Sequence, residues 1–384
     1  MNRDKENAPP ILSIHYRDPD DGWEGFLVID RLVNGCAIGG CRMSESVSMT
    51  ETMRLARGMT RKNTMLGVDI GGAKTGIRFD PSSPRRRQVM ERFFQHIRPI
   101  AETMYAFGPD MNTTSKELDE VAAAVGLDWR LGAVAAGVRG YEPRERYLSG
   151  LALPLGPFSI GDGRTGYGAA VTAMRATEFL GLSGPLQVSV QGFGVVGSAA
   201  AWTLAERGHR VTCVADAGGA YSAPDGLDIE RLMAARGGPP ARLIQASALP
   251  AGVAVGVSDD AVYHDCDILI LASIPDVITM ANVERVKARI VVEAANIAVS
   301  PAAADALHRR GAVVIPDYIA SGSAVLLAAG LIKGWLSHDC AKTLLGQLAD
   351  KLSSVTERAL VAARDMDAAI VRAYSPQMDS HAVS

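Results

Sequence analysis

A glycine-rich turn between two apolar segments is the feature that most constrains the fold of this chain. Residues 186–191, LQVSVQ, alternate apolar and polar side chains, which indicates a β-strand. The turn GFGVVG follows at 192–197, a helix is expected at 198–207, and 210–215 form a second apolar segment. Two strands joined through a helix lie parallel in one sheet, so this region predicts an α/β domain.

The glycine spacing and the acid that ends the second segment predict a dinucleotide-binding site. The turn matches the pattern GxGxxG, and an aspartate follows about 20 residues further on. The glycines allow a tight turn and a close approach of pyrophosphate, and the N-terminus of the helix attracts the anion. The aspartate would bind both ribose hydroxyls and repel a 2′-phosphate, which favours NAD over NADP. The predicted cofactor-binding residues are Gly192, Gly194, Val195, Val196, Gly197 and Asp216.

Further apolar segments predict that the sheet continues beyond this unit. Residues 267–272, 290–293 and 312–315 are short and apolar, as expected for buried parallel strands. Because ligands lie at the carboxyl ends of such strands, Asn296 is a candidate site residue. A helix is expected from the segment GRTGYG to Leu180, and Thr165 within that segment is a candidate helix cap.

Two lysines twelve positions apart, Lys62 and Lys74, are the main chemical feature of the first half. Apolar residues at helical spacing place Lys62 near the end of an amphipathic helix. Residues 68–70 indicate a short strand running into a glycine turn at 71–73, which would present Lys74 at its tip. A lysine in a half-buried cleft beside a second cation can lose its proton and act as a base. A phosphate-binding loop is excluded because an alanine separates the glycines from the lysine, whereas a solvated lysine on a glycine turn remains an alternative.

Asp110 lies in a Gly-Pro-Asp turn that follows an expected helix at 88–104. The Asn-Thr-Thr segment after it, with a helical pattern at 115–125, makes a turn or helix-capping role the ordinary interpretation. A catalytic carboxylate is the alternative that the residues alone leave open.

Four short blocks of the first half have a distinctive order and spacing. They are GGCRM at 39–43, LARGMT at 55–60, Lys62-Asn63 and GGAKT at 71–75. Together they resemble the glutamate/leucine/phenylalanine/valine dehydrogenase family, whose members oxidatively deaminate L-amino acids with a nicotinamide cofactor. The resemblance implies an α/β fold in two domains separated by a cleft. We expect an N-terminal α/β substrate-binding and oligomerisation domain at 1–155, completed by 356–384, and a Rossmann-type NAD-binding domain at 156–355.

The resemblance also implies roles for residues of the first domain. Gly39, Gly40 and Lys62 would bind the α-carboxylate of the substrate. Lys74 would be the general base that activates a water molecule. Asp110 would transfer protons to and from the substrate nitrogen. The two catalytic residues implied by the family are therefore Lys74 and Asp110.

Around the cofactor, the resemblance places Thr165 at the nicotinamide end and directs Asn296 toward the nicotinamide and the substrate. Ala272 is a further expected cofactor contact, although its segment, 271–273, departs from the family's Pro-Cys/Ala-Ala pattern. The family's NAGGV segment is also altered, to SGSAV at 321–325. These departures leave two alternatives open: a specialised-pathway enzyme acting on an unusual amino acid or imine, and a nucleotide-binding homologue without turnover.

Ile38 predicts the kind of substrate. Glutamate dehydrogenases carry a lysine immediately before the corresponding Gly-Gly pair, where it binds the side-chain carboxylate of glutamate. An isoleucine would leave that carboxylate buried and unpaired, which is unfavourable by several kcal/mol. The N-terminal blocks are therefore closest to the leucine/phenylalanine branch, and an apolar or aromatic L-amino acid is the expected substrate. By contrast, the segment at 216–228 looks more like the glutamate branch.

The composition gives no support for other classes of partner. A net charge of −3 on 384 residues gives no reason to expect nucleic acid or an anionic membrane surface. The apolar run at 324–336 is interrupted by a lysine and too short to span a bilayer. Five scattered cysteines without ligand spacing indicate reduced thiols, no metal site and a cytoplasmic protein. The family implies a homo-oligomer that uses NAD and interconverts an amino acid and its 2-oxo acid.

Overall fold

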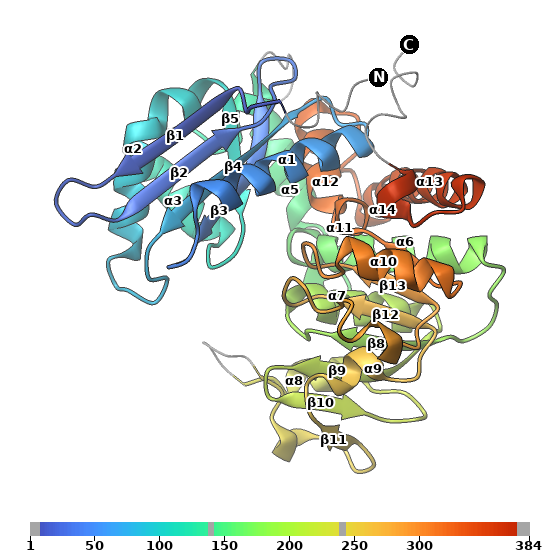
Figure 1. The fold of residues 1–384 in the computed structure, drawn as a ribbon. Helices are drawn as coiled ribbons and strands as arrows, with labels where there is room; N and C mark the ends of the chain where they lie inside the picture. Colours follow the sequence, from blue (N-terminus) through green and yellow to red (C-terminus); the bar gives the residue numbers. More distant parts are fainter. Residues whose placement is uncertain (1–7, 137–141, 238–242, 375–384) are drawn as a thin grey trace. The chain divides into compact units, whose positions relative to one another are not determined.

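The computed structural model describes residues 8–136, 142–237 and 243–374, and within them the chain forms two compact units. The first unit contains the described residues up to Tyr147 together with Ala329–Trp335. The second contains Leu148–Ala328 and the described residues from Leu336 onward. Each unit has its own sheet with helices packed on it, so each is an α/β domain (Figure 1).

In the first unit, five described strands form one sheet in the order β1-β2-β4-β3-β5. Their bounds are β1 Leu12–Arg17, β2 Glu24–Ile29, β3 Ala37–Met43, β4 Gly71–Arg78 and β5 Tyr105–Pro109. Strands β3, β4 and β5 are parallel, whereas β2 is antiparallel to both β1 and β4. The residues that follow the parallel strands therefore lie at one edge of the sheet.

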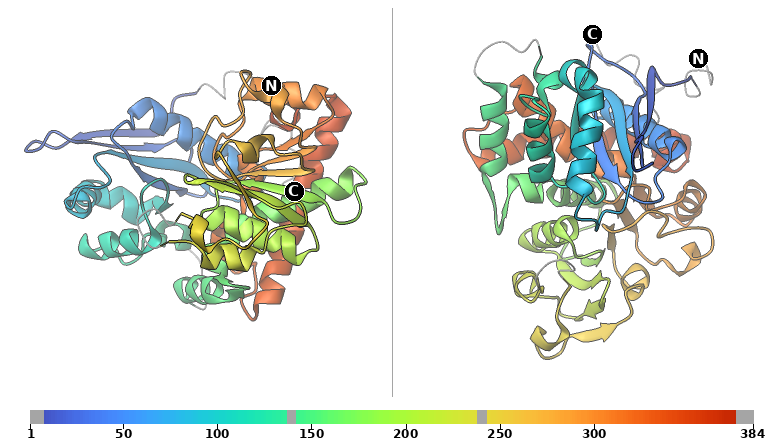
Figure 2. Two further views of the ribbon diagram at one scale, coloured as in Figure 1. Left: turned by 90° about the horizontal axis from the view of Figure 1, so that it is seen from below. Right: turned by 90° about the vertical axis from the view of Figure 1, so that its left-hand side faces the viewer.

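Helices cover both faces of this sheet (Figure 2). They are α1 Met49–Met65, α2 Arg86–Thr103, α3 Ser115–Ala124 and α4 Gly132–Ala135. Helix α5 Pro143–Ala152 follows, and its residues are divided between the two units. Helix α1 packs against β2, β3 and β4, and it begins where the side chain of Ser48 accepts a hydrogen bond from the backbone of Glu51. Helices α2 and α3 pack on the other face, where Phe93 and Phe107 belong to the buried core.

The strand that carries Lys74 differs from the sequence prediction. Residues 68–70 are not a strand; β4 begins at Gly71, so Lys74 lies inside a strand and not at the tip of a glycine turn. The glycines allow neighbouring segments of the chain to pack closely against β4. A β-carbon on Gly72 would lie 2.1 Å from the backbone nitrogen of Thr60 in α1, and one on Gly71 would approach a neighbouring carbonyl as closely. The interpretation of Lys74 as a solvated residue on a turn is therefore wrong.

In the second unit, seven described strands form one sheet in the order β11-β10-β9-β8-β12-β13-β14. Their bounds are β8 Gln187–Gln191, β9 Arg210–Asp216, β10 Gly219–Ser222, β11 Ala254–Gly256, β12 Ile268–Leu271, β13 Ile290–Glu293 and β14 Val313–Ile315. The neighbouring strands β9, β8, β12, β13 and β14 are parallel to one another. Strands β10 and β11 extend the sheet beyond β9 with antiparallel pairing. The structure confirms each parallel strand that the sequence predicted. A separate ribbon pairs β6 Pro154–Leu155 with β7 Phe158–Ser159.

Helices also lie on both faces of the second sheet (Figure 2). The helices of residues 160–373 are α6 Ile160–Phe179, α7 Val195–Glu206, α8 Ile229–Ala234, α9 Asp260–Tyr263, α10 Pro301–Arg309, α11 Asp317–Ala320, α12 Ser323–Lys333, α13 Ala341–Met366 and α14 Ile370–Ala373, with 3₁₀ turns at Ala246–Ala248 and Val283–Arg285. Helices α6 and α7 pack side by side, whereas α9 and α10 share a separate apolar cluster with β12 and β13. None of the helices in the described residues is both long and apolar enough to cross a membrane.

The division of the chain differs from the expected domains in three places. Residues Ala329–Trp335 belong to the first unit, although we expected all of 156–355 in the second. The first unit ends at Tyr147 and not at residue 155. Helix α13 belongs to the second unit, whereas we expected residues 356–384 to complete the first. The physical reason is that α13 packs along α6, burying a stripe that includes Leu344, Leu348 and Leu352. Residues 375–384 lie outside the described part of the chain.

Candidate active site

A buried ion pair between Lys74 and Asp110 is the chemical centre of the first unit. The Nζ atom of Lys74 lies 2.8 Å from Oδ2 of Asp110. Lys74 projects from β4, and Asp110 directly follows β5, so the sheet itself brings the two side chains together. The Lys74 side chain is 6% exposed and that of Asp110 is 13% exposed. The lysine is thus a buried group with a fixed partner.

The Gly-Gly pair of β3 makes room for this ion pair. A β-carbon on Gly40 would lie 2.8 Å from Cβ of Asp110 and 3.0 Å from Nζ of Lys74. A β-carbon on Gly39 would lie 1.8 Å from the carbonyl oxygen of Ala73 in β4. Gly39 is therefore required by strand packing, whereas Gly40 leaves its backbone next to the lysine and the carboxylate.

Arg42 is a site residue that sequence reasoning missed. Its Nε donates to Oδ2 of Asp110 at 2.9 Å, and its Nη1 donates to Oε1 of Glu51 in α1 at 2.6 Å. Asp110 therefore accepts from two cations on neighbouring strands. The available signal was the block GGCRM, in which Arg42 stands two positions after Gly40 and so on the same face of β3.

The charge state of Asp110 follows from these contacts. Burial alone would raise the pKa of Asp110, but the charges of Lys74 and Arg42, with a hydrogen bond from each, outweigh it and lower the pKa to about 2. The side chain is therefore a carboxylate at any pH near neutrality, and the sequence-based alternative of a turn cap does not account for these contacts. The backbone N–H of Asp110 donates to Oγ1 of Thr113, which stabilises the turn separately.

Ile38 and Lys62 lie in the same layer as the ion pair. Ile38 alternates with Gly40 and Arg42 along β3, so its side chain points to the face that α1 covers. It is 7% exposed. Lys62 is in the last turn of α1, as predicted, and is also buried at 8% exposed. The structure thus joins Lys74, Asp110 and Gly40 directly and places the other two residues between the same helix and sheet.

The glycine turn of the second unit fits a dinucleotide phosphate group. Gly192 has φ +96°, a conformation that favours glycine, and a β-carbon on Gly197 would lie 1.9 Å from the carbonyl oxygen of Gly192. Gly194 differs, because no described atom lies within 4 Å of where its β-carbon would be. Gly194 is the N-cap of α7, which begins at Val195, and no side chain of the described residues forms a capping hydrogen bond there. Packing does not explain Gly194, but a bound anion at the helix N-terminus does.

A buried acceptor stands next to this turn. The Oε1 atom of Gln191, the last residue of β8, is buried and has no hydrogen-bond partner among the described residues. Buried polar atoms are nearly always hydrogen-bonded in native proteins, so a missing partner indicates a ligand or water at that point. This orphaned atom and the open position of Gly194 together fit a bound dinucleotide.

Asp216 ends β9 as predicted, and its carboxylate contacts the backbone of the next loops. Oδ1 accepts from the N–H of Gly218 at 2.8 Å, and Oδ2 accepts from the N–H of Ile244 at 2.6 Å. Each carboxylate oxygen keeps a further lone pair that a ribose hydroxyl could use. Arg210 lies at the opposite end of β9, where its charge cannot offset that of Asp216.

Thr165 does not cap a helix, so that interpretation is wrong. Helix α6 begins at Ile160, earlier than predicted, and its cap is Ser159, whose side chain accepts a hydrogen bond from the first turn. Thr165 lies inside the helix. Its neighbour Gly166 is so close to α7 that a β-carbon there would lie 2.3 Å from the carbonyl oxygen of Val196. This contact holds the Thr165 turn near the N-terminus of α7.

The other predicted cofactor contacts gather at one edge of the second sheet. Ala272 follows β12, and its backbone N–H donates to the carbonyl oxygen of Gln191 at 2.7 Å. Asn296 follows β13 in a half-buried turn. Because β8, β9, β12 and β13 are parallel, Ala272 and Asn296 lie at the same edge as the glycine turn and Asp216.

Ser323 belongs to the segment at 321–325 that departs from the family's NAGGV pattern, and it lies where α12 packs on α6. The Oγ atom of Ser323 is buried and has no hydrogen-bond partner among the described residues. It would lie 2.6 Å from a β-carbon on Gly168 in α6. Ser323 therefore meets α6 where only a glycine leaves space for its side chain.

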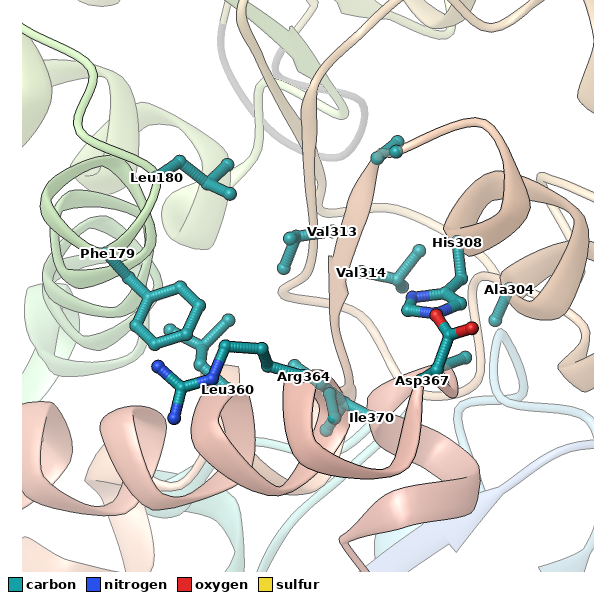
Figure 3. Close-up of a pocket in the computed structure, with 14 residues that line it drawn as sticks. Phe179, Leu180, Ala304, His308, Val313, Val314, Leu360, Arg364, Asp367 and Ile370 are labelled. Atoms are coloured by element: carbon teal, nitrogen blue, oxygen red, sulfur yellow. The ribbon is translucent and has the colours of Figure 1, made fainter.

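A cavity of about 260 Å³ in the second unit is not part of this arrangement (Figure 3). It lies between the end of α6, the beginning of β14 and α13, where Phe179, Val313 and Leu360 form apolar walls. Phe179 is about 20 Å along α6 from Thr165, at 1.5 Å per residue. The cavity is therefore separate from the proposed nucleotide site.

Comparison with known proteins identifies the class. Family models described as "Glutamate/Leucine/Phenylalanine/Valine dehydrogenase" and "Glu/Leu/Phe/Val dehydrogenase, dimerisation domain" match residues 156–372 and 11–125. The chain is 30% identical to the glutamate dehydrogenase of Thermotoga maritima over 319 residues, which are 80% of this chain and 73% of that protein. It is 31% identical to the NADP-specific glutamate dehydrogenase of Saccharolobus shibatae over 328 residues, 82% and 71% of the two chains.

Solved structures agree on the fold. The hetero-hexameric glutamate dehydrogenase from Thermus thermophilus (Leu bound form) superposes with a TM-score of 0.74 at 24% identity, covering 97% of this chain and 88% of that one. L-tryptophan dehydrogenase from Nostoc punctiforme superposes with a TM-score of 0.64 at 15% identity, covering 97% and 94%. The matching family models and the relatives at 30% and 31% identity show that the protein is an oxidoreductase of the amino-acid dehydrogenase class, and a nicotinamide dinucleotide is the cofactor expected of this class. The chain belongs to the glutamate/leucine/phenylalanine/valine dehydrogenase family.

Proposed function

We propose that this protein is an NAD-dependent dehydrogenase that converts an apolar or aromatic L-amino acid to its 2-oxo acid and ammonia. The observation that carries the proposal is the buried contact of 2.8 Å between Lys74 and Asp110, beside the backbone of Gly40. A lysine and a carboxylate held together in this way can exchange protons with a substrate nitrogen and with water.

The proposed roles divide between the two units. In the first, the backbone of Gly39 and Gly40 and the ammonium of Lys62 bind the α-carboxylate. In the second, the glycine turn holds the pyrophosphate and Asp216 holds the adenosine ribose of the cofactor. Thr165, Ala272 and Asn296 line the nicotinamide end.

The proton transfers are assigned to the ion pair. Asp110 accepts a proton from the substrate ammonium, and the amine then has a free electron pair. The nicotinamide, when bound, supplies the acceptor for the hydride from Cα. Lys74 in its uncharged form takes a proton from the water that attacks the resulting iminium carbon. Asp110 then returns its proton to the nitrogen of the carbinolamine, and the C–N bond breaks as the departing ammonia takes the hydroxyl proton. The products are ammonium and the 2-oxo acid, and Lys74 passes its proton to solvent.

The cofactor preference is a first prediction. NAD should give a higher kcat/KM than NADP, because the carboxylate of Asp216 repels a 2′-phosphate. The variant Asp216→Ala should narrow the difference, and the exposed Asp225→Asn should leave it unchanged. Initial rates with both cofactors measure this. A wild-type preference for NADP, as the name of the Saccharolobus shibatae relative indicates for that enzyme, would contradict the assignment.

The substrate class is a second prediction. Leucine, valine, phenylalanine or tryptophan should be oxidised faster than glutamate, because Ile38 is buried and gives a side-chain carboxylate no partner. A screen of the common L-amino acids with NAD and NADP at alkaline pH, followed by absorbance of the reduced cofactor, decides the point. Faster turnover of glutamate would overturn the substrate assignment, and no turnover of any amino acid would favour the non-catalytic alternative.

The partner proposed for the chain is a second copy of itself. The family model that matches residues 11–125 is described as a dimerisation domain, and the superposable Thermus thermophilus enzyme is described as hetero-hexameric. Light scattering of the purified protein tests the homo-oligomer directly.

A further inference from the structure

The turn after β13 contains a residue in an unfavourable backbone conformation. Ile297 has φ +53°, in the left-handed region, where a β-branched residue is a rare outlier. It directly follows Asn296, and its side chain is only partly buried. Since neither the residue type nor core packing favours this conformation, hydrogen bonds to the turn have to maintain it.

Two carboxyl groups accept hydrogen bonds from this turn. The N–H of Ile297 donates to Oδ2 of Asp317 at 3.3 Å, and the N–H of Val299 donates to Oε1 of Glu293 at 2.6 Å. The carbonyl oxygen of Ile297 accepts from the N–H of Asp276 at 2.9 Å. Glu293 is the last residue of β13, and Asp317 is the first residue of α11, so both acceptors belong to regular elements.

Glu293 is an acidic residue in a buried position, where only 5% of it is exposed. Unlike an apolar side chain, it gains no free energy from burial itself. Burial and then the negative charge of Asp317 raise the pKa of Glu293 well above the ordinary range, although the backbone N–H of Val299 favours its ionised form. A buried carboxyl group next to another carboxylate is unfavourable unless it is hydrogen-bonded. The hydrogen bond that Glu293 accepts from Val299 therefore points to a structural role in this turn.

We propose that Glu293 and Asp317 are positioning residues that hold the turn 295–299 in its strained conformation and thereby fix the direction of the Asn296 side chain. Neither carboxyl group is assigned a contact with substrate or cofactor. The inference rests on the proposed function for what Asn296 contacts, but the conformation of the turn is independent of that function. A turn free to relax at Ile297 would rotate the preceding residue away from its position.

The matched variants are Glu293→Ala and Glu293→Gln. The alanine removes the acceptor of the Val299 N–H, whereas glutamine keeps a carbonyl oxygen there and carries no charge. We expect Glu293→Ala to lower kcat by at least about tenfold, since misplacing a contact by about 1 Å can have larger effects. Glu293→Gln should recover most of the loss. Unchanged kcat in a folded Glu293→Ala protein would overturn the proposal.

A third variant separates positioning from folding. Glycine adopts positive φ without strain, so Ile297→Gly in the Glu293→Ala background should restore part of kcat. A general loss of folding would not be repaired in this way, because glycine adds no contact. No recovery in a double variant that keeps its thermal unfolding temperature would count against the proposal.

Hydrogen exchange tests the turn without relying on activity. In the full-length protein, amides of the 295–299 segment should exchange at least about tenfold faster in Glu293→Ala than in the wild type or in Glu293→Gln. Equal exchange in all three proteins would overturn the proposal. If exchange responds as expected while no amino acid is oxidised by the wild type, the proposed function has failed and the positioning of the turn has not.

Discussion

Replacing Lys74 by alanine is expected to lower kcat by at least about 10²-fold, the lower end for loss of a general base. The lysine is held by β4 with its Nζ 2.8 Å from Oδ2 of Asp110, and Arg42 also contacts this carboxylate, with its Nε at 2.9 Å. An arginine does not replace a base, because its guanidinium stays protonated. Steady-state kinetics on the substrate identified by the screen measure the loss.

Two further variants make the result specific. Lys62→Ala should raise KM much more than it lowers kcat, because a carboxylate contact exists in both the ground state and the transition state. Lys116→Ala removes an exposed lysine of the same unit and should change neither constant. Binding of NADH, followed by its fluorescence, should survive in Lys74→Ala, since the glycine turn lies in the other unit. Near-normal kcat in a folded Lys74→Ala protein would refute the assigned role and transfer it to Asp110.

The sequence predicted the second unit better than the first because its signals are local. The apolar strand, the glycine turn and the aspartate at the end of β9 are contiguous, and each has a steric or electrostatic reason that a short segment reveals. The boundaries of α6 were harder to predict. Thr165 stands among glycines that suggest a turn, but those glycines allow α6 to pack against α7 and α12. Such tertiary contacts leave no local signal.

Tertiary contacts around Lys74 and Asp110 in the first unit were also not predictable from the local sequence. The sequence placed Lys74 after a turn, because Gly71 and Gly72 are ordinary turn residues. The structure shows that both glycines permit close packing of β4, which buries the lysine. Arg42 was overlooked because its pairing with Asp110 spans 68 positions in the chain. The pairing becomes visible only when β3 and β5 are known to be neighbours.

Asp110→Asn is expected to lower kcat by at least about 10²-fold, because the amide keeps the shape of the side chain but cannot accept the substrate proton. The change should also remove a pH-dependent part of stability. The pKa of Asp110 is lowered from 3.8 to about 2 in the folded protein. That difference corresponds to about 2 kcal/mol of stabilisation.

The sign follows from the direction of the shift. A carboxyl group whose pKa is lowered by folding stabilises the protein above its unfolded pKa, and the stabilisation is lost as the pH falls through its folded pKa. The difference in unfolding free energy between the wild type and Asp110→Asn should therefore be largest at pH 7 and should shrink between about pH 4 and about pH 2. Urea unfolding at a series of pH values measures it, with Asp225→Asn as a surface carboxylate control. A difference that stays constant down to about pH 3 would show that the charges of Lys74 and Arg42 do not lower the pKa of Asp110 below its ordinary value.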